Sequence, residues 1–367
     1  MGILTTEQLV HGLKNGRPLT PYSIEAEVID AYLKIIETQR MVLRTDSPES
    51  KQFALHIRKP LDFVLPERRR DLGQCDIYVL PFPICMAYAE ESEKRPVIVI
   101  ASGLINLIAN SIFSAYLQSL LPPELDQYYM PQFRKDMPAS HLFANALFLM
   151  RLQFYRFCKP LPNIFALMTP ETLEECKIAI NGALVFTLLH ELGHHKLKYF
   201  QTTRKLRPMH YQFAVKEDLS VFQHQEMEAD DFALNSLVEQ AKIIGTFWQQ
   251  QAVSFFLQME LVSGSYGDKH HPMAINRSFY SDTLRKEWGQ NYDVAPRAAF
   301  YKNTADRYQA TKENKSQEIN ALIQTSREGC LDILSEINQV LLGFGMDIKP
   351  LWSTPSPNWL EINQVPE

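Results

Sequence analysis

One segment of the chain joins a run of apolar residues to three polar side chains that follow it directly. Residues 183–189 are almost entirely apolar, and His190, Glu191 and His194 come next in the run His-Glu-Leu-Gly-His. A run this apolar predicts a helix buried in the core rather than one on the surface. Burying two imidazoles and a carboxylate without a partner costs several kcal/mol, which a bound cation offsets. The segment therefore predicts a metal site at the end of a core helix.

The spacing of the two histidines supports a metal ion. His190 and His194 are four residues apart, so on a helix they share one face and can bind the same ion. Glu191 lies about 100° around the helix axis from His190, near enough to reach a metal-held water without becoming a ligand. This arrangement is typical of zinc hydrolases. The alternative is an amphipathic helix whose histidines have other partners.

A second predicted helix offers a third ligand, which a catalytic zinc ion needs besides a water. Glu226 and Asp230 are also four residues apart and share a face. One carboxylate can bind the metal, while the other accepts the N–H of a ligating histidine and fixes its orientation. Glu228 is the competing acid, and it lies about 200° around the helix from Glu226. Glu226 and Glu228 therefore cannot both face the metal, and we favour Glu226 as the ligand.

The run His-Glu-x-x-His followed by Glu-x-x-Ala-Asp on a second helix resembles the gluzincin metallopeptidases. This resemblance implies Zn²⁺ as the cofactor, with His190, His194 and Glu226 as its ligands. It implies that Asp230 supports a zinc histidine and that Glu191 is the general base. It also implies an α+β fold, mainly helical and zincin-like, with a small sheet beside the active-site helix.

A third segment strengthens the resemblance. Residues 271–277, from His271 to Arg277, resemble the H-P-x-x-x-x-R segment of the CAAX-prenyl-protease and HtpX-like families. By that resemblance His271 helps to hold the oxyanion, since a tetrahedral intermediate gains from a donor aimed at its new charge. Arg277 is expected to pair with Asp230 or Glu226. His270 is adjacent and equally able to donate, and a surface histidine pair at a helix start is the alternative, so this assignment stays open.

Three short strands are predicted before the motif, at residues 75–80, 84–89 and 96–101. Gly103 and Leu104 then open a helix. The same peptidases show this order, with a sheet edge that borders the cleft and takes the substrate as an extra strand. Packing in the core is the alternative role for these strands.

The resemblance extends over roughly residues 75–280 and includes membrane proteins, but the chain predicts no membrane span. Its best apolar stretch, residues 97–121, contains Asn106, Asn110 and Gln118 and ends at two prolines. Among soluble relatives, the Lit-like phage-exclusion peptidases and the ImmA/IrrE-type peptidases are the most similar in pattern. The segment ending at Arg277 favours the Lit-like group.

Composition and charge indicate an intracellular globular protein. Hydrophobic residues make up 46% of the chain and charged residues 22%, with a net charge of -5. The acidic balance argues against nucleic acid as a partner. Acids flank the arginines at 68–70, and this flanking predicts that the arginines form a solvated face. Five scattered cysteines and an N-terminus without a secretory signal predict a cytoplasmic location.

Three sections are expected: an N-terminal helical section at 1–70, a zincin-like catalytic domain at 71–285, and a C-terminal helical section with a proline-rich tail at 286–367. Helical periodicity or composition predicts helices at residues 6–15, 22–40, 140–158 and 310–342. The tail from Pro350 is expected to be extended, with Trp352 and Trp359 packing on the body or on a partner.

Together these features predict a zinc-dependent endopeptidase that cleaves a protein or peptide substrate. Two alternatives remain at this stage. One is a non-catalytic sensor or interaction protein that keeps the zinc fold for stability. The other is a metal-dependent hydrolase of non-peptide bonds, because zinc chemistry is shared and specificity depends on the pocket and loops.

Overall fold

The computed structural model describes the elements around the motif and the C-terminal part of the chain. The described residues are 48–58, 60–80, 85, 87–90, 95–157, 160–197, 218–239, 241–242, 245, 272–287 and 327–362. The helices predicted at 6–15 and 22–40 lie outside them, as do His270 and His271.

The described chain is mainly helical with a small sheet, an α+β arrangement, as predicted. Its α-helices are α3 (Pro48–His56), α4 (Pro66–Gly73), α5 (Ser102–Ser119), α6 (Ala139–Phe157), α7 (Pro170–Lys196), α8 (Val221–Asn235), α10 (Ala274–Glu287), α13 (Arg327–Leu342), α14 (Pro350–Ser353) and α15 (Trp359–Ile362). Short 3₁₀ helices are η1 (Pro60–Phe63), η2 (Pro123–Gln127) and η3 (Ile164–Leu167). The strands are β1 (Asp76–Leu80), β2 (Ala87–Glu90), β3 (Val97–Ala101), β4 (Tyr129–Met130) and β5 (Arg134–Pro138).

The three predicted strands form one sheet in the order β1-β3-β2. β1 pairs parallel with β3, with Asp76 opposite Val97, and β2 pairs antiparallel with β3, with Ala87 opposite Ile100. Residues 98–101 of the central strand are 0% exposed. A run of Val and Ile with no polar interruption suits a strand that is covered on both faces.

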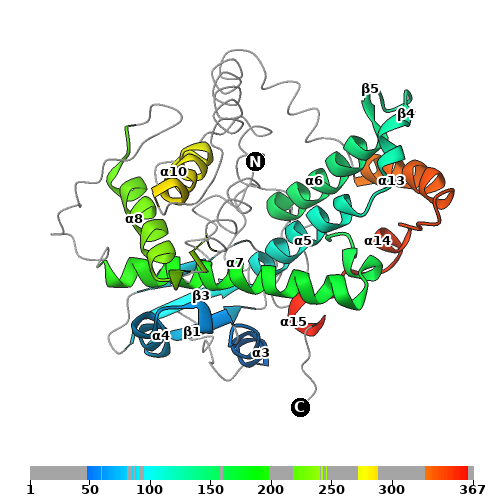
Figure 1. The fold of residues 1–367 in the computed structure, drawn as a ribbon. Helices are drawn as coiled ribbons and strands as arrows, with labels where there is room; N and C mark the ends of the chain where they lie inside the picture. The colour runs from blue at the N-terminus through cyan, green and yellow to red at the C-terminus, as the bar shows by residue number, and fades with distance from the viewer. Residues whose placement is uncertain are drawn as a thin grey trace, which may run out of the picture.

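Helix α7 runs through the middle of the described structure, with other elements on both sides of it (Figure 1). Pro170 occupies its first turn, and the Thr169 side chain caps it by accepting from the backbone N–H of Thr172. Helices α5 and α8 and strand β2 pack against it, so most of its length is buried. Figure 1 shows α8 and α10 above one end of α7 and α5 and α6 above the other, with the sheet below.

Among the described residues, α7 is long and apolar enough to cross a membrane, but 72% of its most apolar stretch is buried in the protein. A core helix of a soluble protein meets the same criterion, so this is weak evidence for a span. The stretch at 97–121, which the sequence offered as the best apolar segment, divides into β3 and α5.

The C-terminal elements pack on the helices that precede the motif. Helix α13 packs against α6, and the predicted helix at 140–158 is confirmed as α6. Trp359 is 0% exposed, and its ring lies 5.7 Å from that of Phe113 and 6.0 Å from that of Phe165. The tail therefore packs on the body, as one of the two predicted options.

The prediction that this tail is fully extended is wrong. It contains two short helices, α14 and α15, and Pro350 is the first residue of α14. Proline is tolerated in a first helical turn because the N–H that it lacks has no helical acceptor there. Burial of Trp359 then holds α15 against α3 and α5.

Candidate metal centre

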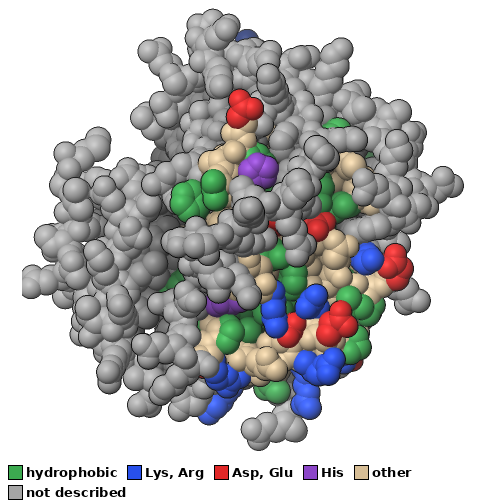
Figure 2. Space-filling model, turned by 90° about the vertical axis from the view of Figure 1, so that its left-hand side faces the viewer, with side chains coloured by type: hydrophobic (Ala, Val, Ile, Leu, Met, Phe, Trp, Pro, Cys, Tyr) green, Lys and Arg blue, Asp and Glu red, His purple; other side chains and the backbone are tan. Residues whose placement is uncertain are grey.

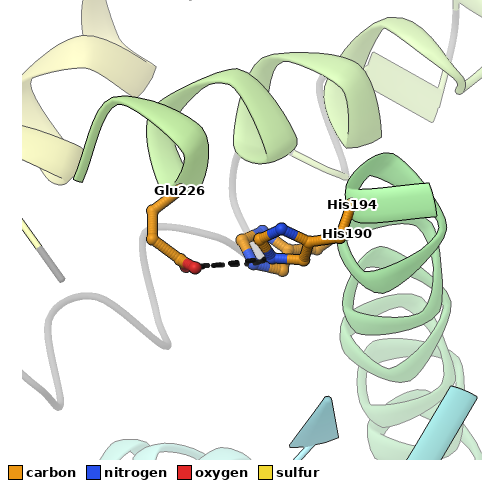
Figure 3. Close-up of side chains that lie close together, drawn as sticks. All are labelled: His190, His194 and Glu226. Atoms are coloured by element: carbon orange, nitrogen blue, oxygen red, sulfur yellow. Dashed lines mark hydrogen bonds and ion pairs between the residues drawn. The ribbon is translucent and has the colours of Figure 1, made fainter. Parts of the chain in front are cut away.

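The two motif histidines lie on one face of α7, near its C-terminal end. His190 is buried, and His194 follows one turn later in the same direction. Across from them, Glu226 extends from the second turn of α8, so three side chains from two helices point at a common position (Figure 3). A capping box between Ser220 and Gln223 begins α8 and fixes where that second turn lies.

The distances within this group are short. The Nε2 atoms of His190 and His194 are 3.2 Å apart. Glu226 Oε2 lies 3.2 Å from Nε2 of His190, and Oε1 lies 3.4 Å from Nε2 of His194. One ligand atom from each residue falls within 4.8 Å of the others, so the three side chains could hold a metal ion.

Asp230 lies behind His190, on the side away from this group. Its Oδ1 is 2.9 Å from Nδ1 of His190, and the carboxylate is 0% exposed. Arg277 of α10 donates to both oxygens of Asp230, from Nε at 2.8 Å and from Nη2 at 2.7 Å. A buried carboxylate with a bidentate arginine is charge-balanced, and it holds the histidine ring in one orientation.

Burial and neighbouring charges shift the pKa values of His190, His194 and Asp230. Burial lowers the pKa of His190, but hydrogen bonds to Asp230 and Glu226 outweigh it and raise that pKa to about 10. Burial and the charge of His190 lower the pKa of His194 to about 4. Burial raises the pKa of Asp230, but the Arg277 charge and the bond to His190 hold it well below its usual range. The two histidines are thus inequivalent.

Glycine in the motif allows α7 and α8 to approach closely. A Cβ atom added to Gly193 would lie 3.2 Å from Cα of Ala229 and 3.2 Å from Cδ1 of Phe232. Contact with a backbone atom cannot be relieved by rotating a side chain, so a larger residue would push the helices apart. Gly193 and Ala229 therefore set the separation across which Glu226 reaches the histidines.

A third histidine, His195, anchors the end of α7 to the sheet. Its Nε2 lies 2.9 Å from the backbone oxygen of Val97 at the start of β3, and Lys196 pairs with Asp71 of α4. Sequence reasoning did not single out Gly193, His195 or Lys196. The signal for Gly193 was its position opposite a small residue on the facing helix, whereas the contact of His195 spans 98 positions in the chain.

The predicted site residues occupy different places relative to this group. His190, His194 and Glu226 come together, and Asp230 and Arg277 form a second group behind His190. Glu191 is buried next to His190 in the chain, and Glu228 is buried but is not a member of the ligand group. His271 and its competitor His270 lie outside the described residues.

Basic side chains near the end of α7 alternate with acids. Arg68 pairs with Asp71 at 3.0 Å and Arg69 with Asp62 at 3.1 Å. Figure 2 shows this face of the molecule, with Lys and Arg side chains interleaved with Asp and Glu in its lower part. Arg68 is partly exposed and Arg69 and Arg70 are exposed, so the run forms a solvated face, as predicted.

Comparison with known proteins gives one match. Residues 160–281 match the model of the family Peptidase U49, a Lit-like peptidase family. The matched segment spans α7, α8 and the first half of α10 and so includes the residues grouped here. No curated protein and no solved structure matches the chain. The match supports a peptidase, whose substrates would be proteins.

Proposed function

We propose that the chain is a zinc-dependent endopeptidase of the gluzincin type, with His190, His194 and Glu226 as the metal ligands. The observation that carries this proposal is the convergence of three ligand atoms, from two helices, within 4.8 Å. The family match to a peptidase supports it independently. A zincin-like domain and a relation to the Lit-like peptidases are part of the same proposal.

The spacing of the donor atoms fits zinc. Nitrogen and oxygen ligands bind zinc at about 2.0–2.2 Å in a tetrahedron, which places neighbouring ligand atoms about 3.3–3.5 Å apart. The two histidine Nε2 atoms are 3.2 Å apart, close to that spacing. Each ring also lies near a different oxygen of Glu226, His190 at 3.2 Å from Oε2 and His194 at 3.4 Å from Oε1. Two imidazoles and one carboxylate also form a ligand set that zinc hydrolases use, with a fourth position left for water.

The contact of His190 with Asp230 also favours metal binding once the ion displaces the proton on Nε2. Because Asp230 is paired with Arg277 and stays ionised, it accepts a hydrogen bond from Nδ1–H of His190. A neutral imidazole that donates from Nδ1 has its lone pair on Nε2, which faces His194 and Glu226. Asp230 thus orients a ligand and does not itself bind the ion.

The reaction needs a base, and Glu191 is the proposed one. A bound Zn²⁺ supplies Lewis acidity, which makes water a nucleophile near neutral pH and polarises a carbonyl. Glu191 takes the proton of the attacking water and passes it to the leaving amine. His271 is proposed to donate to the developing oxyanion. We propose that the substrate is a cytoplasmic protein or peptide.

The test replaces Glu191 and Glu226 separately. Glu191→Gln keeps the size of the side chain but removes the base, so zinc should remain bound while cleavage falls by at least about 100-fold. Glu226→Ala should deplete the metal. Wild type and both variants are expressed in cells, and new protein termini are counted by mass spectrometry, together with the zinc-to-protein ratio of each purified protein.

Cleavage by Glu191→Gln at the wild-type rate would overturn the assigned base. A wild-type protein that takes up no zinc would overturn the metal site. If Glu191→Gln still performs the cellular task while cleaving nothing, the non-catalytic zinc-fold protein is the correct alternative.

A further inference from the structure

Helix α10 contacts α8 through two polar side chains on successive turns. Arg277 donates to Asp230, and Tyr280, three residues later, donates its hydroxyl to Oδ1 of Asp231 at 2.8 Å. The two acceptors are neighbours in the chain. Since residues three apart on a helix lie on the same side, α10 uses one side to hold two adjacent carboxylates of α8.

Asp231, which accepts the hydrogen bond from Tyr280, is itself held in place by a further contact. Asn235, one turn further along α8, donates from Nδ2 to Oδ1 of Asp231 at 2.9 Å and to the Asp231 backbone oxygen at 3.0 Å. Tyr280 is 7% exposed, so packing restricts its ring as well. The hydrogen bond between Tyr280 and Asp231 therefore joins two groups with little freedom of their own.

The arginine depends on the placement of α10 more strictly than the tyrosine does. A bidentate contact needs both Nε and Nη2 within hydrogen-bond distance of two carboxylate oxygens at once. If α10 shifts or rotates along α8, one of those two bonds lengthens. Asp230 would then hold His190 less firmly, since the same Oδ1 accepts from Nη2 of Arg277 and contacts Nδ1 of His190.

We infer that Tyr280 is a positioning residue for the metal site. Its hydrogen bond to Asp231 fixes α10 on α8, and this keeps Arg277 bidentate to Asp230 and the His190 ring aimed at the ion. The inference rests on the metal site of the proposed function. It extends the chain of contacts from the ion outwards: His190, Asp230, Arg277 and then, through the backbone of α10, Tyr280.

The test measures metal binding and needs no substrate. Tyr280→Phe removes one hydroxyl and keeps the ring, so the helix packing is retained. Loss of one hydrogen bond this far from the ion should weaken Zn²⁺ binding about fivefold, and the visible absorption bands of the Co²⁺-loaded protein should shift as the ligand geometry relaxes. Asp231→Leu removes the acceptor and should reproduce both changes.

Two controls separate positioning from general stability. Thr283→Val also removes a hydroxyl from α10, one that donates to the backbone oxygen of Phe279 in the same helix, and it should leave zinc affinity and the Co²⁺ spectrum unchanged. In an Arg277→Ala background, Tyr280→Phe should change zinc affinity by less than about twofold, because the tyrosine acts through the arginine.

The outcomes are distinct. If the wild-type protein binds neither Zn²⁺ nor Co²⁺, the proposed function fails and this inference fails with it. If wild type binds the metals and Tyr280→Phe matches it in affinity and spectrum, the inference alone is wrong. A full Tyr280→Phe effect without Arg277, or an equal effect of Thr283→Val, also overturns it.

Discussion

His190 lies between two carboxylates, and each contacts a different ring nitrogen. Asp230 is 2.9 Å from Nδ1, and Glu226 is 3.2 Å from Nε2. These contacts raise the pKa of His190 to about 10, whereas burial and the charge of His190 lower the pKa of His194 to about 4. One histidine of the pair is therefore protonated at neutral pH and the other is not, until an ion displaces the proton.

Zinc uptake should release a proton from His190. At pH 7 the proton occupies Nε2, the nitrogen proposed to bind the ion, so metal binding and protonation compete. Zinc affinity should therefore rise with pH, about tenfold per unit between pH 6 and 8. Calorimetry at pH 7 in buffers with different ionisation enthalpies should give about one proton released per zinc.

The matched variant for this measurement is Glu226→Gln, which removes the charge beside Nε2. It should bind zinc more weakly and release fewer protons, since the pKa of His190 loses one of the groups that raise it. A wild-type release close to zero would contradict the protonation state described here.

At the scale of elements, the separation of α7 and α8 decides whether the ligands meet. Gly193→Ala introduces a Cβ that would lie 3.2 Å from Cα of Ala229. Overpacking costs about 1–3 kcal/mol, against about 1 kcal/mol gained in helix propensity. The first effect should dominate, with a net loss of about 1 kcal/mol and weaker zinc binding. Urea unfolding and zinc titration measure the two changes.

The control is Gly73→Ala at the end of α4, where an added Cβ meets nothing within 4 Å. It should leave stability and zinc affinity at the wild-type level or slightly raise stability. Equal behaviour of the two alanine variants would show that the close approach at Gly193 does not limit the packing of the helices.

The elements that the sequence predicted well have strong local signals. The predicted helix at 140–158 is α6 at Ala139–Phe157, and three short runs of strand-forming residues became β1, β2 and β3. Helical spacing placed His190 and His194 on one face, and the resemblance to the gluzincins added Glu226 from a second helix. The helices and strands depend on residues that are close in the chain. The grouping of the three side chains depends on the geometry that the proposed metal ligands require.

Other features depend on contacts between distant residues and could not be predicted. His195 meets Val97 across the sheet, and Tyr280 meets Asp231 from another helix. Residues from Pro350 onwards looked extended because of their prolines. Helix α15 forms there because the body buries Trp359, so tertiary packing outweighs local propensity.

At the scale of the whole molecule, the C-terminal elements connect parts of the chain that precede the motif. The N–H of Asn163 donates to the oxygen of Leu351 at 2.7 Å, and the N–H of Trp359 donates to Oδ1 of Asn106 at 2.7 Å. His56 at the end of α3 is buried and hydrogen-bonds the backbone of Leu360. The last described helix thus joins α3 to α5.

This junction should make stability depend on pH. Burial lowers the pKa of His56, more than its backbone hydrogen bond to Leu360 raises it, and Lys177 lowers it further. The unfolded chain therefore binds a proton more readily than the folded one, so stability is lost as the pH falls through about 6.5. Urea unfolding of wild type and His56→Gln at pH 7 and pH 5 isolates the effect. If both lose stability equally, His56 does not contribute.

The pairing of Asp230 with Arg277 has a consequence for how the protein handles its proposed ion. Because an internal arginine already neutralises this hidden acid, the scaffold carries no bare charge there that only zinc could balance. Removal of the proposed ion by a chelator should therefore abolish the proposed activity while the protein stays folded, and adding the ion back should restore that activity. A shortage of the metal would therefore reduce the proposed activity reversibly and would not unfold the protein or expose it to proteolysis.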